Sequence, residues 1–180
     1  MQAEQPKLPQ LKMRFNKFDS LLEVVIPEGY SMRTFQDGDE DGWVEVLNST
    51  NELGEWDRKR IEDFLEGEWH AIKEGTFFIT YGGKIVATAC TVHPTPTEER
   101  PELGWVSASP DHQGKRLGYQ ATLEVLHFTV KMGYPEIFLR SDDWRLPALK
   151  TYLNLGFEPE MAHESHPERW KTVYEQLGFG

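Results

Sequence analysis

The chain has 180 residues, of which 38% are hydrophobic and 27% are charged, and its formal net charge at pH 7 is -11. This profile predicts one globular domain with a sizeable hydrophobic core and excludes an intrinsically disordered chain. The acidic balance argues against nucleic-acid and anionic-membrane partners, and because no segment reads as a signal peptide or a membrane span, we expect a cytoplasmic protein.

Hydrophobic periodicity and turn residues predict an N-terminal extension over residues 1–28 and a single domain over residues 29–180. The apolar stretch 21–26 of the extension is expected to pack on the body of the domain. The elements predicted next are a strand at 29–35, helices at 39–51 and 57–65, strands at 76–81 and 84–92, and a proline-rich loop at 94–101.

The second half of the domain continues the alternation of helices and strands. Its predicted elements are a strand at 102–109, a loop and helix at 113–131, a strand at 137–140, a helix at 147–155, a strand after Gly156-Phe157 and a final helix at 167–177. This order predicts an α+β fold in which helices flank a mixed sheet.

Cysteine and metal patterns exclude two kinds of site. Cys90 is the only cysteine, so the chain has no intrachain disulfide and no cysteine-based zinc cluster. The acidic run 37–41 begins like a calcium loop, but its twelfth position is Asn48 where such a loop has glutamate. We therefore expect no metal.

The loop 113–118 has the composition of an anion-binding site. It joins a predicted strand to a predicted helix, and the first N–H groups of a helix are unpaired and carry a partial positive charge. Gly114 and Gly118 allow close approach of the backbone, and Lys115 and Arg116 add full charges. Alone, the loop is equally typical of an ordinary helix start with two solvated cations.

Two segments resemble the GNAT N-acetyltransferase superfamily, and the resemblance covers roughly residues 29–162. Residues 106–118, VSASPDHQGKRLG, look like the acyl-CoA pyrophosphate loop of the family, Gln/Arg-x-x-Gly-x-Gly/Ala. Residues 148–157, ALKTYLNLGF, are similar to its late helix, Ala-x-x-x-Tyr-x-x-x-Gly-Phe. Arg116 stands where the family usually has glycine, and Arg145 stands where it often has asparagine.

The resemblance implies a three-layer α/β/α fold whose mixed, mostly antiparallel central sheet is splayed between its fourth and fifth strands, counted from residue 29. It also implies acetyl-CoA as cosubstrate, with the pantetheine arm pairing along the fourth strand. The main-chain N–H near Ala108 would then stabilise the oxyanion. The coenzyme-binding residues implied are Val106, Ser107, Ala108, Gln113, Gly114, Lys115, Arg116, Leu117 and Gly118.

Two side chains are candidates for proton transfer. The resemblance implies that Tyr152 is the general acid that protonates the departing thiolate, although its helical position alone is also typical of a core aromatic residue. Glu102 is the candidate base, directly or through water, and period-two alternation places it on the same face as Val106 and Ala108. Glu98 and Glu99 are alternatives, and Glu102 also reads as a solvated strand-end residue.

The expected activity is transfer of an acetyl group to the amine of a small molecule or peptide, by direct attack in a ternary complex. The alternative is a non-catalytic acyl-CoA-binding module. A homodimer is left open. Residues expected to wall the acceptor site, each also readable as surface or packing, are 51–56, Trp69 and His70, with His163, Glu164 and His166 opposite.

Overall fold

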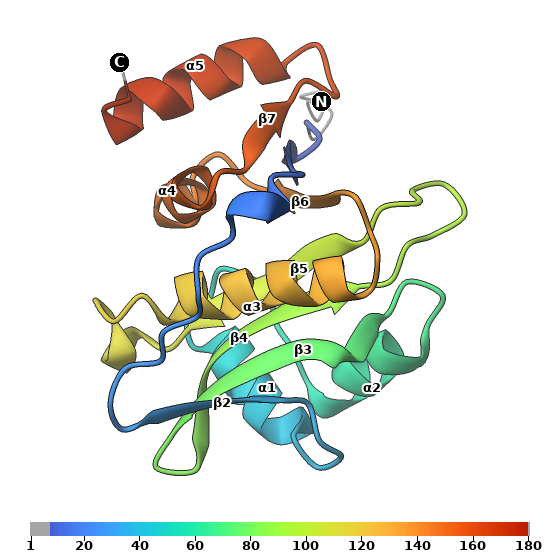
Figure 1. The fold of residues 1–180 in the computed structure, drawn as a ribbon, viewed down its shortest axis with the longest axis vertical. Helices are drawn as coiled ribbons and strands as arrows, with labels where there is room; N and C mark the ends of the chain where they lie inside the picture. Colours follow the sequence, from blue (N-terminus) through green and yellow to red (C-terminus); the bar gives the residue numbers. More distant parts are fainter. Residues whose placement is uncertain (1–7, 180) are drawn as a thin grey trace, which may run out of the picture.

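The computed structural model describes residues 8–179, so part of the predicted N-terminal extension, residues 1–7, lies outside the described residues (Figure 1). The strands of the described part are β1 (Leu11–Phe15), β2 (Tyr30–Thr34), β3 (Ala71–Tyr81), β4 (Lys84–Val92), β5 (Glu102–Ala108), β6 (Ile137–Ser141) and β7 (Glu158–Glu160). The α-helices are α1 (Glu40–Asn48), α2 (Arg58–Glu66), α3 (Leu117–Lys131), α4 (Leu146–Leu155) and α5 (His166–Leu177). Short 3-10 helices are η1 (Phe18–Ser20) and η2 (Pro110–His112).

The strands form one sheet in the order β2-β3-β4-β5-β6-β1-β7. Every neighbouring pair is antiparallel except β5 and β6, which are parallel and share a single register pair, Glu102 with Phe138. Beyond that pair the two strands diverge. The predicted mixed, mostly antiparallel sheet is thus confirmed, and its splay lies between β5 and β6, the fourth and fifth strands counted from residue 29.

Both faces of the sheet are covered, which explains why its central strands read as nearly continuous apolar runs. In β3, Phe77 belongs to the core under α3, whereas its neighbour Phe78 packs with Trp43 of α1. Successive strand residues point to opposite faces, so two adjacent buried phenylalanines require a layer on each side. Figure 1 shows α3 on one side of the sheet and α1 with α2 on the other.

The N-terminal segment contributes an inner strand that the sequence analysis does not predict. β1 lies between β6 and β7 and is antiparallel to both. Its alternate residues Leu11, Met13 and Phe15 are at most 3% exposed, so they form part of the main core. The strand has a period of two because one face is buried and the other carries charge.

The segment 21–26 packs on the body of the domain. Leu21, Val24 and Ile26 are partly buried against the core under α3. Two side chains of α3 fix the backbone of the segment: the amide oxygen of Gln120 accepts from the Val25 N–H at 2.9 Å, and His127 Nε2 lies 2.8 Å from the Leu22 carbonyl. The extension is therefore held by both strand pairing and helix contacts.

Candidate active site

A cleft of about 720 Å³ lies where β5 and β6 diverge. Its walls come from β5, the end of β6, the start of α4, the loop between α1 and α2, and residues 8–10 of the N-terminal segment. The cleft is thus assembled from parts of the chain that are far apart in sequence.

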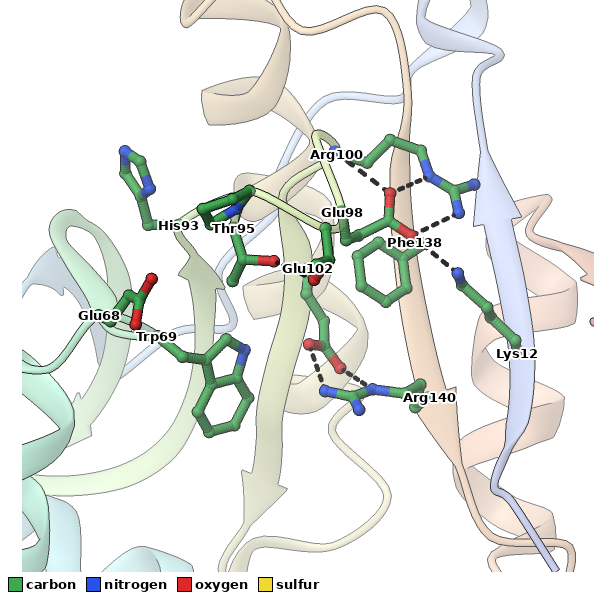
Figure 2. Close-up of a pocket in the computed structure, with 12 residues that line it drawn as sticks. Lys12, Glu68, Trp69, His93, Thr95, Glu98, Arg100, Glu102, Phe138 and Arg140 are labelled. Atoms are coloured by element: carbon green, nitrogen blue, oxygen red, sulfur yellow. Dashed lines mark hydrogen bonds and ion pairs between the residues drawn. The ribbon is translucent and has the colours of Figure 1, made fainter.

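A second cavity, of about 760 Å³, adjoins the cleft and is called the chamber below (Figure 2). Trp69, Glu102 and Arg140 line both cavities, so these side chains stand at their junction. The chamber is otherwise lined by Lys12, Glu68, His93, Thr95, Pro96, Thr97, Glu98, Arg100 and Phe138. The two cavities therefore adjoin each other at Trp69, Glu102 and Arg140.

Some backbone groups of β5 point away from β4, toward the cleft. The Ser109 N–H donates to the Val86 carbonyl on β4 at 2.8 Å, and Ser107 is in register with Thr88 of β4. Main-chain groups alternate between the two edges of a strand, so those of Val106 and Ala108 face the diverging β6 edge. The N–H and C=O groups of Val106 and Ala108 therefore point toward the edge from which β6 diverges, and those of Ser107 point toward β4.

The side chain of Ser107 points away from the cleft, toward α1. Its hydroxyl donates to the Val46 carbonyl of α1 at 3.0 Å, and the residue is buried. Ser107 therefore anchors β5 to α1 through its side chain, and the residue lines neither cavity.

A bulge at Trp105 breaks the alternation of β5. Trp105 has φ +49, and the register of β4 with β5 shifts between Thr88 and Cys90. Leu103 belongs to the core under α3, yet Trp105 packs against Phe64 of α2 with ring centroids 4.6 Å apart. Residues on either side of an inserted residue exchange faces.

The prediction that Glu102 shares a face with Val106 and Ala108 is therefore wrong. Gly104, on the same face as Glu102, lies next to Cys90 and Val92 of the core beside α1 and α2, whereas Val106 contacts the core under α3. The extra residue at the bulge puts the Glu102 carboxylate on the chamber side. The backbone groups of Val106 and Ala108 still point toward the diverging β6, and Val106 lines the cleft.

Glu102 lies at the junction of the cavities with its carboxylate already paired. It is 6% exposed, and its two oxygens accept from Nε and Nη2 of Arg140, each at 2.8 Å (Figure 2). The pair lies beside the indole of Trp69, whose centroid is 6.0 Å from the Arg140 guanidinium. A base at this position has to act from within an ion pair or through a bound water.

The two alternative bases are less suitable. Glu98 accepts from Arg100 and from Lys12, and these cations, Arg100 first, hold the pKa of Glu98 at about 2. A carboxylate with so low a pKa is a poor proton acceptor. Glu99 is exposed and lines neither cavity.

The loop 113–118 presents backbone donors as predicted. Among residues 8–179, no protein acceptor pairs with the backbone N–H groups from Gly114 to Tyr119; the next, that of Gln120, donates to the Arg116 carbonyl at 3.0 Å. Gln113, Gly114, Lys115 and Arg116 are exposed, while Leu117 is buried at the start of α3. The start of the helix therefore offers a row of free donors.

Arg116 adopts the conformation that glycine supplies in the family motif. Its φ is +57, and its guanidinium lies 4.1 Å from the centroid of the Tyr119 ring. The side chain thus points outward and is held by a cation–π contact, which leaves the backbone donors accessible. Gly118 lies against β5, where a Cβ would be 3.5 Å from Val106 Cγ1.

Tyr152 lies on α4 and lines the cleft. The residue is 4% exposed, and burial raises the pKa of its phenol to about 12, an effect that nearby Arg145 opposes and Glu52 reinforces. Phe157 packs edge-on against the ring at 5.9 Å. Tyr152 is thus both a core aromatic residue and a hydroxyl at the cleft.

The predicted acceptor walls are found only in part. Glu52, Leu53 and Gly54 line the cleft, and Trp69 lines both cavities. His70 lines neither cavity, and its ring stacks on His93 at 4.9 Å.

The prediction that His163, Glu164 and His166 form the opposite wall of the acceptor site is wrong. His163, Glu164 and His166 line neither cavity, and His166 is 1% exposed with Nδ1 3.1 Å from the Glu160 carbonyl. These residues belong to the turn that starts α5 rather than to the site.

The sequence analysis also missed Lys12 and Arg140. Arg140 is the one charged residue of β6, but nothing in the sequence indicates that it pairs with Glu102 of β5. Lys12 was missed because its strand was not predicted.

Two further findings concern other chemistries. Within residues 8–179, no three His, Cys, Asp or Glu side chains gather as a metal-binding group, and none of the helices is both long and apolar enough to cross a bilayer. Cys90 is buried, and burial raises the pKa of its thiol well above the usual range. This thiol has the character of an inert core residue.

Comparisons with known proteins agree with this geometry. The model of the acetyltransferase (GNAT) family matches residues 41–157. A mycothiol acetyltransferase of Thermomonospora curvata is 34% identical over 154 residues, which cover 82% of this chain and 50% of that protein. One from Pseudarthrobacter chlorophenolicus is 30% identical, covering 81% of this chain and 48% of its own. The chain spans about half the length of these curated relatives.

Solved structures share the fold. A GCN5-related N-acetyltransferase from Sphaerobacter thermophilus has a TM-score of 0.69 at 20% identity, covering 85% of this chain and 50% of that chain. The ribosomal-protein-S18-alanine N-acetyltransferase from Escherichia coli has a TM-score of 0.58 at 20% identity, with 72% and 77% covered. The extent of the family match, together with the splayed sheet, shows that the chain belongs to the GNAT acetyltransferase family.

Proposed function

We propose that this chain transfers an acetyl group from acetyl-CoA to the amine of a small molecule or peptide, by direct attack in a ternary complex. One observation carries the proposal: the open backbone edge of β5 and the hydroxyl of Tyr152 meet in one cleft, and the free N–H groups at the start of α3 follow directly on from β5. Each of these features matches a different part of a bound acyl-CoA.

The residues present fit the coenzyme. The free N–H groups from Gly114 to Tyr119 suit a pyrophosphate, and Lys115 and Arg116 add positive charge beside them. The β5 groups of Val106 and Ala108 suit the amides of a pantetheine arm. We assign the Ala108 N–H to the thioester carbonyl, where it would stabilise the developing oxyanion.

The acceptor must lose a proton before it attacks. An amine with a pKa near 10.4 is almost fully protonated at pH 7. We assign removal of this proton to Glu102 or to a water that it holds, since Glu102 is the carboxylate at the junction of the two cavities. The amine nitrogen then forms the new bond to the acyl carbon, and the carbon–sulfur bond breaks.

Tyr152 is assigned to protonate the sulfur as it leaves. A solvated thiol has a pKa of about 8.5, whereas burial raises the pKa of Tyr152 to about 12. The proton transfer is therefore unfavourable by roughly three pKa units unless the cleft also raises the proton affinity of the sulfur or stabilises the negative charge on the phenolate.

The chamber is the proposed acceptor site. It adjoins the cleft at Glu102, and its lining combines the indole of Trp69 with charges of both signs from Glu68, Lys12 and Arg100. Because the curated relatives are named mycothiol acetyltransferases, amines related to mycothiol are the first acceptors to try. Amino sugars, amino acids, polyamines and peptide N-termini complete the panel.

The test is a thiol-release screen of this panel with acetyl-CoA, alongside calorimetry of coenzyme A binding. We expect binding and acceptor-dependent thiol release. Binding without release for any amine would favour a non-catalytic acyl-CoA-binding module, and absence of binding would overturn the proposal.

A further inference from the structure

Arg145 spans the cleft at the start of α4. Its Nε donates to the Glu52 carboxylate at 3.2 Å, and its Nη2 lies 3.5 Å from the Val106 carbonyl. The side chain is 10% exposed, although Glu52 is 41% exposed. A guanidinium is thus held, largely away from water, between the open edge of β5 and the loop after α1.

Arg145 and Tyr152 belong to the same face of the cleft. They are seven residues apart, which is close to two helical turns, and both line the cavity. The rise between them is about 10 Å along the axis, a span that a long arginine side chain shortens. The two side chains therefore line one cleft.

The other charged groups of the cleft have contacts that do not involve Arg145 or Glu52. Glu102 and Arg140 neutralise each other through two hydrogen bonds. The remaining charges there are occupied: Asp142 accepts from Gln10 Nε2 at 3.1 Å, and the Arg60 guanidinium lies 4.1 Å from the Trp56 ring centroid. Of the charged groups of the cleft, Arg145 lowers the pKa of Tyr152 and Glu52 raises it.

We propose that Arg145 is a positioning residue whose charge, balanced by Glu52, supports transfer of the Tyr152 proton to the departing sulfur. This inference rests on the proposed function. When the carbon–sulfur bond breaks, its electron pair stays on sulfur, the phenolic proton moves to that sulfur, and the negative charge passes to the phenolate oxygen. Arg145 stabilises the charge at either atom, and solvent returns the proton to Tyr152 after the thiol leaves.

Arg145 also donates a hydrogen bond to the Val106 carbonyl, which the pantetheine arm is expected to use. Val106 has lost its strand partner at the splay, and the guanidinium is within reach of its oxygen. Entry of the coenzyme would free Arg145 from this contact. Removing the side chain should therefore leave coenzyme affinity unchanged or increase it, whereas loss of an ordinary binding residue would weaken it.

A site-specific titration tests the charge assignment without requiring activity. A fluorinated tyrosine, whose phenol titrates at a lower pH than tyrosine, is placed at position 152 and followed by fluorine NMR. We expect Arg145→Gln to move the titration to higher pH and Glu52→Gln to move it to lower pH, each by at least half a unit. Arg58→Gln removes one positive charge outside both cavities and should leave the titration unchanged.

Kinetics with acetyl-CoA complete the test. Arg145→Gln should lower kcat on the order of tenfold, the change that one pKa unit represents, and Arg145→Lys should restore most of it. If the native chain releases thiol but the titration of residue 152 is the same in Arg145→Gln, or moves in the same direction in both cleft variants, the inference fails while the proposed function stands. If the titrations shift as expected but no amine supports thiol release, the proposed function fails instead.

Discussion

Arg116 holds a left-handed backbone conformation directly before α3, where two opposing effects meet. A non-glycine residue with φ near +57 is strained by roughly 1 kcal/mol. Its guanidinium regains part of this through the Tyr119 ring, a contact worth about 0.5–1 kcal/mol at an exposed site. The position therefore accepts an arginine that adds charge to the proposed phosphate site.

The substitution Arg116→Gly separates these effects. Relief of strain, loss of the cation–π contact and the greater unfolded-state entropy of glycine should nearly cancel, so stability in urea should change by less than about 0.5 kcal/mol. Coenzyme A binding should weaken several-fold at low salt and less at high salt, because the lost charge is exposed. Affinity that is independent of salt would contradict a phosphate role for this side chain.

Tyr152→Phe removes the hydroxyl but keeps the ring that packs against Phe157. General acids typically contribute 10²–10⁴-fold, so kcat should fall by about 10²-fold or more while coenzyme A affinity by calorimetry changes little. Tyr174→Phe is the control, since Tyr174 is a partly buried tyrosine that lines neither cavity. Unchanged turnover in Tyr152→Phe would show that the phenol only packs.

At the scale of elements, the strands and helices after residue 29 are predictable because local signals mark them. Gly156, with φ +102, ends α4, and Gly82-Gly83 forms the β3–β4 turn. The strand β1 alternates apolar residues with Lys12 and Arg14, but it is only five residues long and its partner strand β6 lies more than 120 residues away. Only the folded sheet reveals that the strand is internal.

The bulge at Trp105 limits how much of the candidate site can be predicted from the sequence. Alternation along β5 assumes one residue per position of β4, and the inserted residue is visible only in the register between the strands. The sequence therefore predicts that Glu102, Ala108 and Tyr152 lie near one another. It cannot predict on which face Glu102 lies or that Arg140 pairs with it.

A charge network joins the strands on the far side of the chamber. Glu98, before β5, accepts from Lys12 of β1 and from Arg100, and Arg100 also donates to Glu136, before β6, and to Glu160 of β7. The cations lower the pKa of Glu98 from 4.5 to about 2. Since the folded-state pKa is the lower one, the ionised carboxylate stabilises the fold above pH 4.5, and this contribution is lost as the pH falls toward 2.

Glu98→Gln should accordingly destabilise the protein at pH 7 by about 1–2 kcal/mol, less than the whole pKa shift implies because the side chain is 27% exposed. The difference from the native chain in urea denaturation should shrink between pH 4.5 and pH 3. Glu99→Gln, an exposed neighbour, should show neither effect. A difference that does not depend on pH would mean that the carboxylate acts through packing alone.

At the scale of the molecule, the N-terminal segment pairs with strands from the C-terminal half of the chain. β1 is inserted between two strands of the C-terminal half, and residues 8–10 continue from it into the cleft. Lys12 points from the same strand into the chamber (Figure 2). We propose on this ground that the extension and the domain that follows fold as one unit, so that the site depends on the extension.

Met13→Ala tests this dependence, since Met13 is 0% exposed between β6 and β7 and carries no charge toward the site. Truncating a fully buried methionine typically costs about 2–5 kcal/mol, whereas Arg14→Ala, on the exposed face of the same strand, should change stability by less than about 0.5 kcal/mol. In Met13→Ala, amide hydrogen exchange in β6 should quicken together with exchange in β1, because the two strands share their hydrogen bonds. If urea denaturation of Met13→Ala matched that of the native chain and exchange in β6 stayed slow, the extension would be an appendage rather than part of the cooperative fold.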